Sequence, residues 1–178
     1  MPRSVESPIV RHAAAADLDC LPVIERSAAE AFRGAGVSLS ADAPVSSAED
    51  WRGALRAGTL WVAEGDAGRI VGFLAGRRIN RVLHIDEMDV AFDHQRRGFG
   101  RALLDAAIDW ARKAALKEIT LTTFRELAFN RHFYESAGFV EVGPSEMSKR
   151  MAGIMAREAE YGLDPPQRCA MVLRLKRR

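Results

Sequence analysis

Apolar and polar positions recur along the chain with two periods, and the period distinguishes strands from helices. Runs that alternate, or that are apolar throughout, predict strands at 8–12, 59–64, 69–79, 82–90, 117–124, 139–142 and 169–175. Helical spacing and helix-stop residues predict helices at 18–32, 48–58, 98–113, 129–138 and 145–162. No internal repeat or low-complexity tract interrupts this pattern.

Turn and capping residues set the limits of several of these elements. Asp17 precedes the first helical run and is predicted to cap it, with Pro22 near the position where a helix tolerates proline. The turn residues 65–68 join two strands and predict a hairpin. The segment 33–47 is small, polar and rich in glycine and proline, which predicts a loop.

The order of these elements predicts the fold class. Antiparallel pairing comes first, and one parallel crossover joins 82–90 to 117–124 through a helix. The run 82–90 has apolar residues at both odd and even positions, so apolar side chains point to both faces of the strand, which favours a central strand. We therefore expect one α/β (α+β) domain over 1–178, with a mixed, mostly antiparallel central sheet and helices on both faces.

Composition narrows the class of protein without defining its chemistry. With 178 residues, 48% hydrophobic and 28% charged, the chain reads as a globular domain with a real core. The net charge of +2 gives no reason to expect nucleic acid, and the basic end at 174–178 carries no interleaved aromatic residue. Two cysteines far apart support neither a metal site nor a disulfide framework. With no apolar run long enough for a membrane span and no signal-peptide core, the expected location is cytoplasmic.

The stretch 94–114 carries the first candidate chemistry. Glycine costs roughly 1 kcal/mol against alanine in a helix, yet Gly98 and Gly100 lie where a helix begins. A helix N-terminus offers backbone N–H groups and the positive end of a dipole, and three arginines lie nearby, so the stretch predicts a diphosphate cradle. A Rossmann fingerprint would need glycine at Leu103, and no Walker A loop occurs. A glycine-rich turn entering an ordinary core helix is the alternative for the glycine pair alone.

Two blocks of sequence resemble a known family. The segment from Gln95 through Gly100 is similar to the Q/R-x-x-G-x-G/A signature of the GNAT superfamily of N-acetyltransferases, and it follows a strand that ends at Val90. A threonine-rich strand is then followed by the block 129–143, which contains Asn130 and Tyr134 and resembles a second motif of that family. The resemblance covers about 8–143 and is strongest over 82–143; the stretch 145–178 looks like a tail of some bacterial members.

The resemblance implies acetyl-CoA as co-substrate and a set of residues that hold it. Backbone groups of Met88, Asp89 and Val90 would meet the pantetheine arm. Asn130 would contact the cofactor, and Tyr134 would lie beside the thioester sulfur as general acid. Family members also splay the strand 82–90 from 117–124 with a bulge near 87–89, and they often form homodimers. The amides that would hold the pyrophosphate are those of Gln95, Arg96, Arg97, Gly98, Phe99, Gly100 and Arg101.

Transfer of an acetyl group to an amine also requires a base, because an alkylammonium is almost fully protonated at neutral pH. The strand 82–90 offers Asp86, Glu87 and Asp89. We predict Glu87 as the base, with Asp89 as the second choice, acting directly or through water. For each carboxylate taken singly, a solvated strand end or a salt bridge to a nearby arginine is the alternative. A bulge in this strand would change which side chains point to which face of the sheet. The spacing of Glu87 and Asp89 therefore does not show which of them is the base.

The sequence therefore predicts an acetyl-CoA-dependent N-acetyltransferase that acts on a primary amine by direct attack in a ternary complex. No cysteine lies near the predicted site, which disfavours a covalent acetyl-enzyme. The alternative is a non-catalytic acyl-CoA-binding or regulatory module. Acidic residues near the site suit a cationic acceptor, either a small molecule or a peptide amine. His84 and His132 are interpreted as structural, and Trp51 and Trp61 as core or loop anchors.

Overall fold

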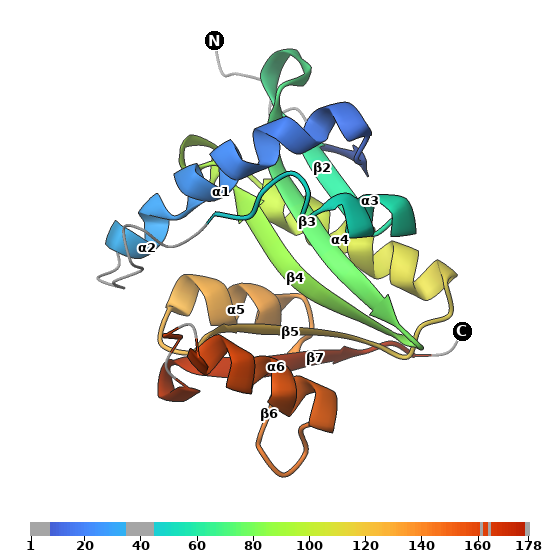
Figure 1. The fold of residues 1–178 in the computed structure, drawn as a ribbon, viewed down its shortest axis with the longest axis vertical. Coiled ribbons are helices and arrows are strands. Elements are labelled where there is room, and N and C mark those ends of the chain that lie inside the picture. Colours follow the sequence, from blue (N-terminus) through green and yellow to red (C-terminus); the bar gives the residue numbers. More distant parts are fainter. Residues whose placement is uncertain (1–7, 35–44, 161, 164, 177–178) are drawn as a thin grey trace. The chain divides into compact units, whose positions relative to one another are not determined.

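The computed structural model describes residues 8–34, 45–160, 162–163 and 165–176. Seven strands are hydrogen-bonded in the order β1-β2-β3-β4-β5-β7-β6 (Figure 1). Two compact units share the central strand β4 (Val82–Val90), since one contains 1–78 and 86–110 and the other contains 79–85 and 111–178. The sheet is mixed, as the sequence predicts, with antiparallel pairs on both sides of the parallel pair β4–β5. The prediction of a single domain over 1–178 remains a prediction.

The first unit is built on an antiparallel meander. Strand β1 (Ile9–His12) pairs with β2 (Leu60–Glu64), and β2 pairs with β3 (Ile70–Ile79) through the predicted hairpin. The turn contains a short 3-10 helix (Asp66–Gly68). The helices of the first unit include a 3-10 helix (Ala15–Cys20), α1 (Leu21–Ala28), α2 (Glu30–Gly34), α3 (Arg52–Ala57) and most of α4 (Phe99–Lys113).

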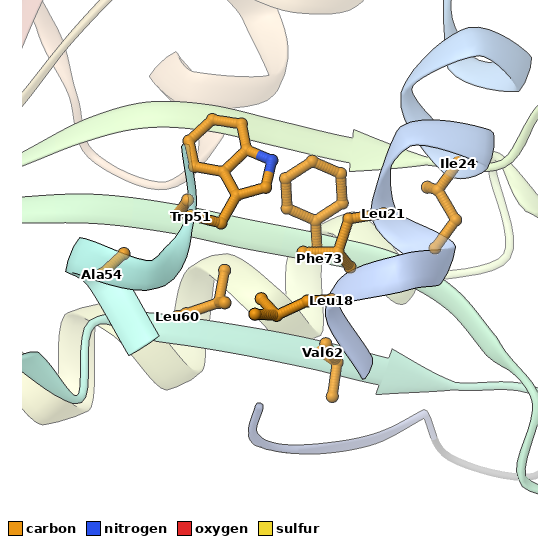
Figure 2. Packing of buried hydrophobic residues seen from close by; sticks show 9 residues of the cluster. Leu18, Leu21, Ile24, Trp51, Ala54, Leu60, Val62 and Phe73 are labelled. Carbon is orange, nitrogen blue, oxygen red and sulfur yellow. The ribbon is translucent and has the colours of Figure 1, made fainter. Parts of the chain in front are cut away.

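Alternation along β2 and β3 sends side chains to two faces of the first unit. On one face, Leu60, Val62 and Phe73 pack against Leu21 of α1 and Trp51 beside α3 (Figure 2). On the other face, Trp61 meets Trp110 of α4 edge to face, with ring centroids 5.7 Å apart. Helices therefore cover both faces of this part of the sheet, and Trp51 and Trp61 are core residues, 8% and 3% exposed.

The second unit joins three strands to the start of β4. Strand β5 (Glu118–Phe124) runs parallel to β4 at Val82–His84 and antiparallel to β7 (Arg168–Arg174) along its whole length. Strand β7 also pairs with β6 (Val140–Val142). Helix α5 (Ala128–Ser136) precedes β6, while α6 (Lys149–Glu160) and a 3-10 helix (Pro165–Gln167) lie between β6 and β7 in the sequence. The tail 145–178 thus supplies a strand inside the sheet.

A polar network joins α6 to the threonines of β5. Thr120 Oγ1 accepts a hydrogen bond from Arg150 Nη2 at 3.2 Å and contacts His84 Nδ1 at 2.9 Å. Glu158 accepts from Arg168 Nε at 3.1 Å. His84 is 2% exposed and lies in this network, in agreement with its structural interpretation. Threonine side chains of β5 therefore anchor α6 through hydrogen bonds.

Four sequence predictions need correction. The helix expected at 18–32 is divided into a 3-10 helix, α1 and α2, with Pro22 at the start of α1, because proline fits only the first turn of an α-helix. Asp17 does not cap α1; its carboxylate accepts the N–H of Ala14 at 2.7 Å and so closes the preceding 3-10 turn.

The helix expected at 48–58 is also shorter, because 48–51 form turns before α3. The helix expected at 145–162 begins only at Lys149. Ser148 accepts the N–H of Met151 at 3.2 Å through its hydroxyl, which is the N-cap contact that fixes this start. Most of the predicted loop 33–47 lies outside the described residues.

Candidate functional site

The end of β4 is held close to β3 by a glycine. A Cβ placed on Gly72 would lie 2.9 Å from the carbonyl oxygen of Asp89, 3.1 Å from Val90 Cγ2 and 3.3 Å from Leu103 Cδ1 of α4. The N–H of Ala91 then donates to Val71 O at 2.8 Å. Only glycine permits this approach, which fixes the strand that carries Met88, Asp89 and Val90.

The chain passes from β4 to α4 through a tight turn. A 3-10 helix (Phe92–His94) follows Ala91, and the side chain of Gln95 donates back to Val90 O at 3.0 Å. Arg96 and Gly98 then adopt the left-handed region, with φ of 59° and 89°. The N–H of Gln95 is used inside the turn, where it donates to Phe92 O at 3.2 Å.

The N-terminus of α4 is formed as the sequence predicts. Its first helical bond runs from the N–H of Ala102 to Gly98 O at 3.0 Å, so the N–H groups of Phe99, Gly100 and Arg101 precede the helical ladder. Arg101 pairs with Asp105, whereas Arg97 lies over the Phe99 ring with 5.9 Å from its guanidinium carbon to the ring centroid. Helical N–H groups, a helix dipole and exposed arginines together suit a diphosphate.

The carboxylates of β4 have different environments. Asp86 is engaged with Arg77, at 2.6 Å between its Oδ1 and Nη2, so for this residue the salt-bridge alternative is correct. Asp89 retains some exposed surface as a residue, but the burial of its carboxyl group is the main cause that raises its pKa well above the usual range. The negative charges of Glu87 and Glu25 raise that pKa further. Glu87 is partly buried.

Glu25 is a residue of this acidic group that the sequence analysis missed. It lies on α1, and burial raises the pKa of its carboxyl, which accepts the backbone N–H of Ser46. Its sequence signal is weak, because a single glutamate beside Ile24 on an amphipathic helix is normally a solvated residue. Only the folded chain brings it within electrostatic range of Asp89.

Asn130 and Tyr134 belong to α5 in the second unit. The N–H of Asn130 donates to Leu127 O at 2.9 Å, in the first turn of the helix. Tyr134 is 9% exposed, and its ring packs edge to face against Phe133 and Phe139, at 5.1 and 5.8 Å between centroids. Gly138, with φ of 92°, turns the chain into β6, as its predicted role as a helix stop requires.

The described residues contain neither a metal cluster nor a membrane span. No group of three or more His, Cys, Asp or Glu side chains there has the arrangement of a metal site. In the same parts of the chain, no helix has the length and apolar character needed to cross a membrane. Cys20 and Cys169 are both thiols.

Sequence comparison assigns the family. The profile of the Acetyltransferase (GNAT) family matches residues 24–139, which includes β4, the turn, α4 and α5. The chain belongs to this family. It is also similar to N-acetyltransferase family 8 member 3 of Rattus norvegicus, with 29% identity over 90 residues. That match covers 47% of this chain and 39% of the rat protein, so it spans about two fifths of its relative's length.

Solved structures show the same fold. N-acetylglutamate synthase from Neisseria gonorrhoeae, complexed with coenzyme A and N-acetyl-glutamate, superposes with a TM-score of 0.67 at 19% identity, over 96% of this chain and 36% of that one. PaiA N-acetyltransferase from Thermoplasma acidophilum, in complex with coenzyme A, gives a TM-score of 0.68 at 16% identity, over 95% of this chain and 99% of that one. The fold expected from the sequence is confirmed.

Proposed function

We propose that this protein is an acetyl-CoA-dependent N-acetyltransferase that transfers the acetyl group directly to a primary amine. The observation that carries the proposal is the continuous path from the acidic end of β4, through the turn at Arg96 and Gly98, into the N-terminus of α4. Membership of the acetyltransferase family supports the same activity. Two similar folds were solved with coenzyme A, which supports this co-substrate.

The proposal gives the cofactor-binding residues distinct tasks. The N–H groups at the start of α4 and at Arg96 and Arg97 hold the pyrophosphate, and the arginine side chains add positive charge. Gln95 acts by clamping the turn to Val90 O, since its own N–H is engaged with Phe92. Backbone groups of Met88 to Val90 hold the pantetheine arm, and Asn130 adds a contact from α5. Bound acetyl-CoA supplies the activated acyl group.

The proposal assigns one proton transfer to a carboxylate of β4 and the other to Tyr134. A carboxylate of β4 takes the proton from the acceptor ammonium, which leaves a neutral amine to attack the thioester carbonyl. Glu87 and Asp89 are both candidates for this base, and burial together with two acidic neighbours raises the pKa of Asp89, the direction that strengthens a carboxylate as a proton acceptor. The Tyr134 hydroxyl then protonates the departing thiolate of coenzyme A.

The proposed acceptor is a cationic amine. The negative charges of Glu87 and Glu25 act on Asp89, and a positively charged acceptor would relieve that repulsion. The class includes small-molecule amines and peptide amines. The charge of the site does not select one of them, so the test uses a panel.

The experiment measures release of coenzyme A from acetyl-CoA with a panel of polyamines, aminoglycosides, peptides and lysine. Acetylated product with at least one amine is expected. Gly100→Glu puts a negative side chain at the cradle, while glutamate itself favours the first turn of a helix. Calorimetry should show acetyl-CoA binding weakened by at least ~2 kcal/mol in a protein that is still folded.

Tyr134→Phe separates turnover from binding. The ring and its packing are retained, so acetyl-CoA affinity should change little while kcat falls roughly 10- to 1000-fold. An unchanged kcat with chemistry rate-limiting would refute the role of Tyr134. Tight acetyl-CoA binding with no turnover of any amine would favour the non-catalytic acyl-CoA-binding alternative.

A further inference from the structure

One carboxylate of β6 contacts two arginines that come from different parts of the chain. Glu141 Oε1 accepts a hydrogen bond from Arg125 Nη1, and Glu141 Oε2 lies 3.4 Å from Arg131 Nη1. Arg125 directly follows β5, whereas Arg131 lies in the first half of α5. All three residues belong to the second unit. Glu141 therefore joins β6 to the chain on both sides of the point where α5 begins.

Arg125 is itself fixed to the start of β7. Its backbone N–H donates to Gln167 O at 2.7 Å, and its Nη2 donates to Arg168 O at 3.3 Å. Gln167 ends the last 3-10 helix, and Arg168 is the first residue of β7. The guanidinium of Arg125 is thus held by the sheet, and Glu141 connects it to α5 through Arg131.

Tyr134 lies one turn further along α5. It follows Arg131 by three residues, so the two side chains are neighbours on the helix surface. The carbonyl oxygen of Tyr134 accepts the N–H of Phe139 at 3.1 Å, and the two rings pack edge to face. Phe139 directly precedes β6. The chain at β6 therefore contacts α5 both at Tyr134 itself and, through Glu141, at Arg131.

A second ion pair of Arg131 shows by contrast what the Glu141 bridge adds. Arg131 Nε donates to Glu135 Oε1 at 2.8 Å, four residues later in the same helix. That pair stabilises the helix without fixing it to another element. The contact with Glu141 joins α5 to a strand, so it constrains where the helix lies on the sheet.

We propose that Glu141 is a positioning residue that acts through Tyr134: its carboxylate holds Arg125 and Arg131 together and so fixes α5, and with it the Tyr134 hydroxyl. The inference rests on the proposed function, in which Tyr134 is the general acid. In that step the C–S bond of the thioester breaks, the sulfur keeps its electron pair, and the proton passes from Tyr134 Oη to the sulfur. Solvent then returns a proton to the phenolate, and Glu141 exchanges none.

The physical reason is the sensitivity of proton transfer to geometry. A displacement of about 1 Å at a reacting group can lower a rate by about 100-fold. The Glu141 ion pairs are partly exposed, with 21% of the Glu141 side chain accessible, and exposed ion pairs contribute little to folding stability. Loss of the bridge should therefore leave the protein folded while α5 becomes less precisely placed.

Glu141→Gln is the informative variant, because an amide of the same size offers one oxygen and cannot accept from both arginines. We expect kcat for the best amine of the panel to fall roughly 5- to 100-fold. The affinity for acetyl-CoA should change much less, because the proposed pyrophosphate contacts belong to α4 and the turn before it. Arg131→Gln breaks the same bridge from the helix side and should give the same pattern. Glu135→Gln removes an equal charge and a partner of Arg131, leaves the bridge intact, and is the matched control.

A double-mutant cycle tests whether the effect passes through Tyr134. In the Tyr134→Phe background, no phenol remains to be positioned, so Glu141→Gln should cost little further kcat. Hydrogen exchange of the Phe139 N–H in the resting protein gives a readout without turnover. Its exchange should become roughly threefold faster or more in Glu141→Gln, and should be unchanged in Glu135→Gln.

The outcomes separate this inference from the proposed function. An equal loss of kcat from Glu141→Gln in both backgrounds would show a general structural role and overturn the inference. Unchanged kcat in folded Glu141→Gln and Arg131→Gln would overturn it as well, as would unchanged exchange of the Phe139 N–H. The proposed function fails in a different way: Tyr134→Phe then keeps the wild-type kcat, or the wild type acetylates no amine, and the inference falls with it.

Discussion

Two aspartates of β4 show how environment assigns different tasks to the same side chain. Asp86 is held by Arg77, and its carboxylate is a structural partner. Asp89 lies further along the strand, where burial and two acidic neighbours raise the pKa of its carboxyl. A proton acceptor needs such a raised pKa, whereas an ion pair holds the carboxylate in its charged form. Asp89 is therefore the better candidate for the base.

Matched amide variants test this assignment. In Asp89→Asn, the rate at neutral pH should fall roughly 100-fold or more and recover as pH rises toward the pKa of the acceptor amine, because neutral amine then arrives without help. Asp86→Asn should show no such recovery. If Glu87→Gln shows the recovery and Asp89→Asn does not, the base is Glu87, and if neither does, the proton leaves by another route. Pre-steady-state rates of acetyl transfer between pH 6 and 10 give the answer.

At the scale of elements, the site depends on how closely β3, β4 and α4 pack. Gly72 allows β3 to approach the backbone of Asp89 and the side chain of Leu103 at once. The turn from β4 into α4 is then closed by Gln95 and by left-handed residues. The backbone of β4 that is proposed to bind the cofactor is therefore positioned by a glycine of the neighbouring strand β3.

Gly72→Ala should disturb this packing. The added methyl group would lie 2.9 Å from a backbone oxygen, so β4 or α4 must shift, at a cost of about 1–3 kcal/mol in the free energy of unfolding. Acetyl-CoA binding should weaken at the same time. Gly53→Ala in α3 has nothing within 4 Å of the new methyl and should stabilise the protein by up to about 1 kcal/mol. Urea unfolding and calorimetry check both; equal behaviour of the two variants would contradict the argument.

At the scale of the whole molecule, the proposed base links stability to pH. The folded protein retains the Asp89 proton at pH values where the unfolded chain, with a pKa of about 3.9, has released it. The free energy of unfolding therefore decreases as pH rises from that value toward the raised pKa of Asp89. Below both pKa values this residue contributes no pH dependence.

Asp89→Asn removes that titration. Relative to the wild type, the variant should gain stability as pH increases, by ~1 kcal/mol or more at pH 8 compared with pH 4. Other carboxyl groups titrate in both proteins, so they cancel in the difference. Urea unfolding at several pH values measures it, and a difference that stays constant with pH would show that Asp89 keeps an ordinary pKa. This readout does not depend on catalysis.

Periodicity and local backbone signals were sufficient for most of the fold. The hairpin β2–β3, the strand β4 and the helix stop at Gly138 follow from residues that are neighbours in sequence. The start of α4 near Gly98 and Gly100 was also predicted, because backbone conformation is determined within a few residues, while the diphosphate cradle there stays a prediction. Two helix starts differ from those that periodicity predicts: Pro22 lies in the first turn of α1, where its missing N–H is tolerated, and the hydroxyl of Ser148 accepts a backbone N–H at the start of α6.

By itself, then, the sequence determined the order of the elements, the central place of β4 and the candidate residues on it. Only the tertiary structure decided which carboxylate is paired and which is buried: Asp86 meets Arg77, while Asp89 is influenced by Glu25 from a helix far away in the chain. The physical reason is that hydrophobic period and turn geometry are local properties. Burial and electrostatic interaction instead depend on distances that arise only when α1, β3 and α4 pack around the end of β4.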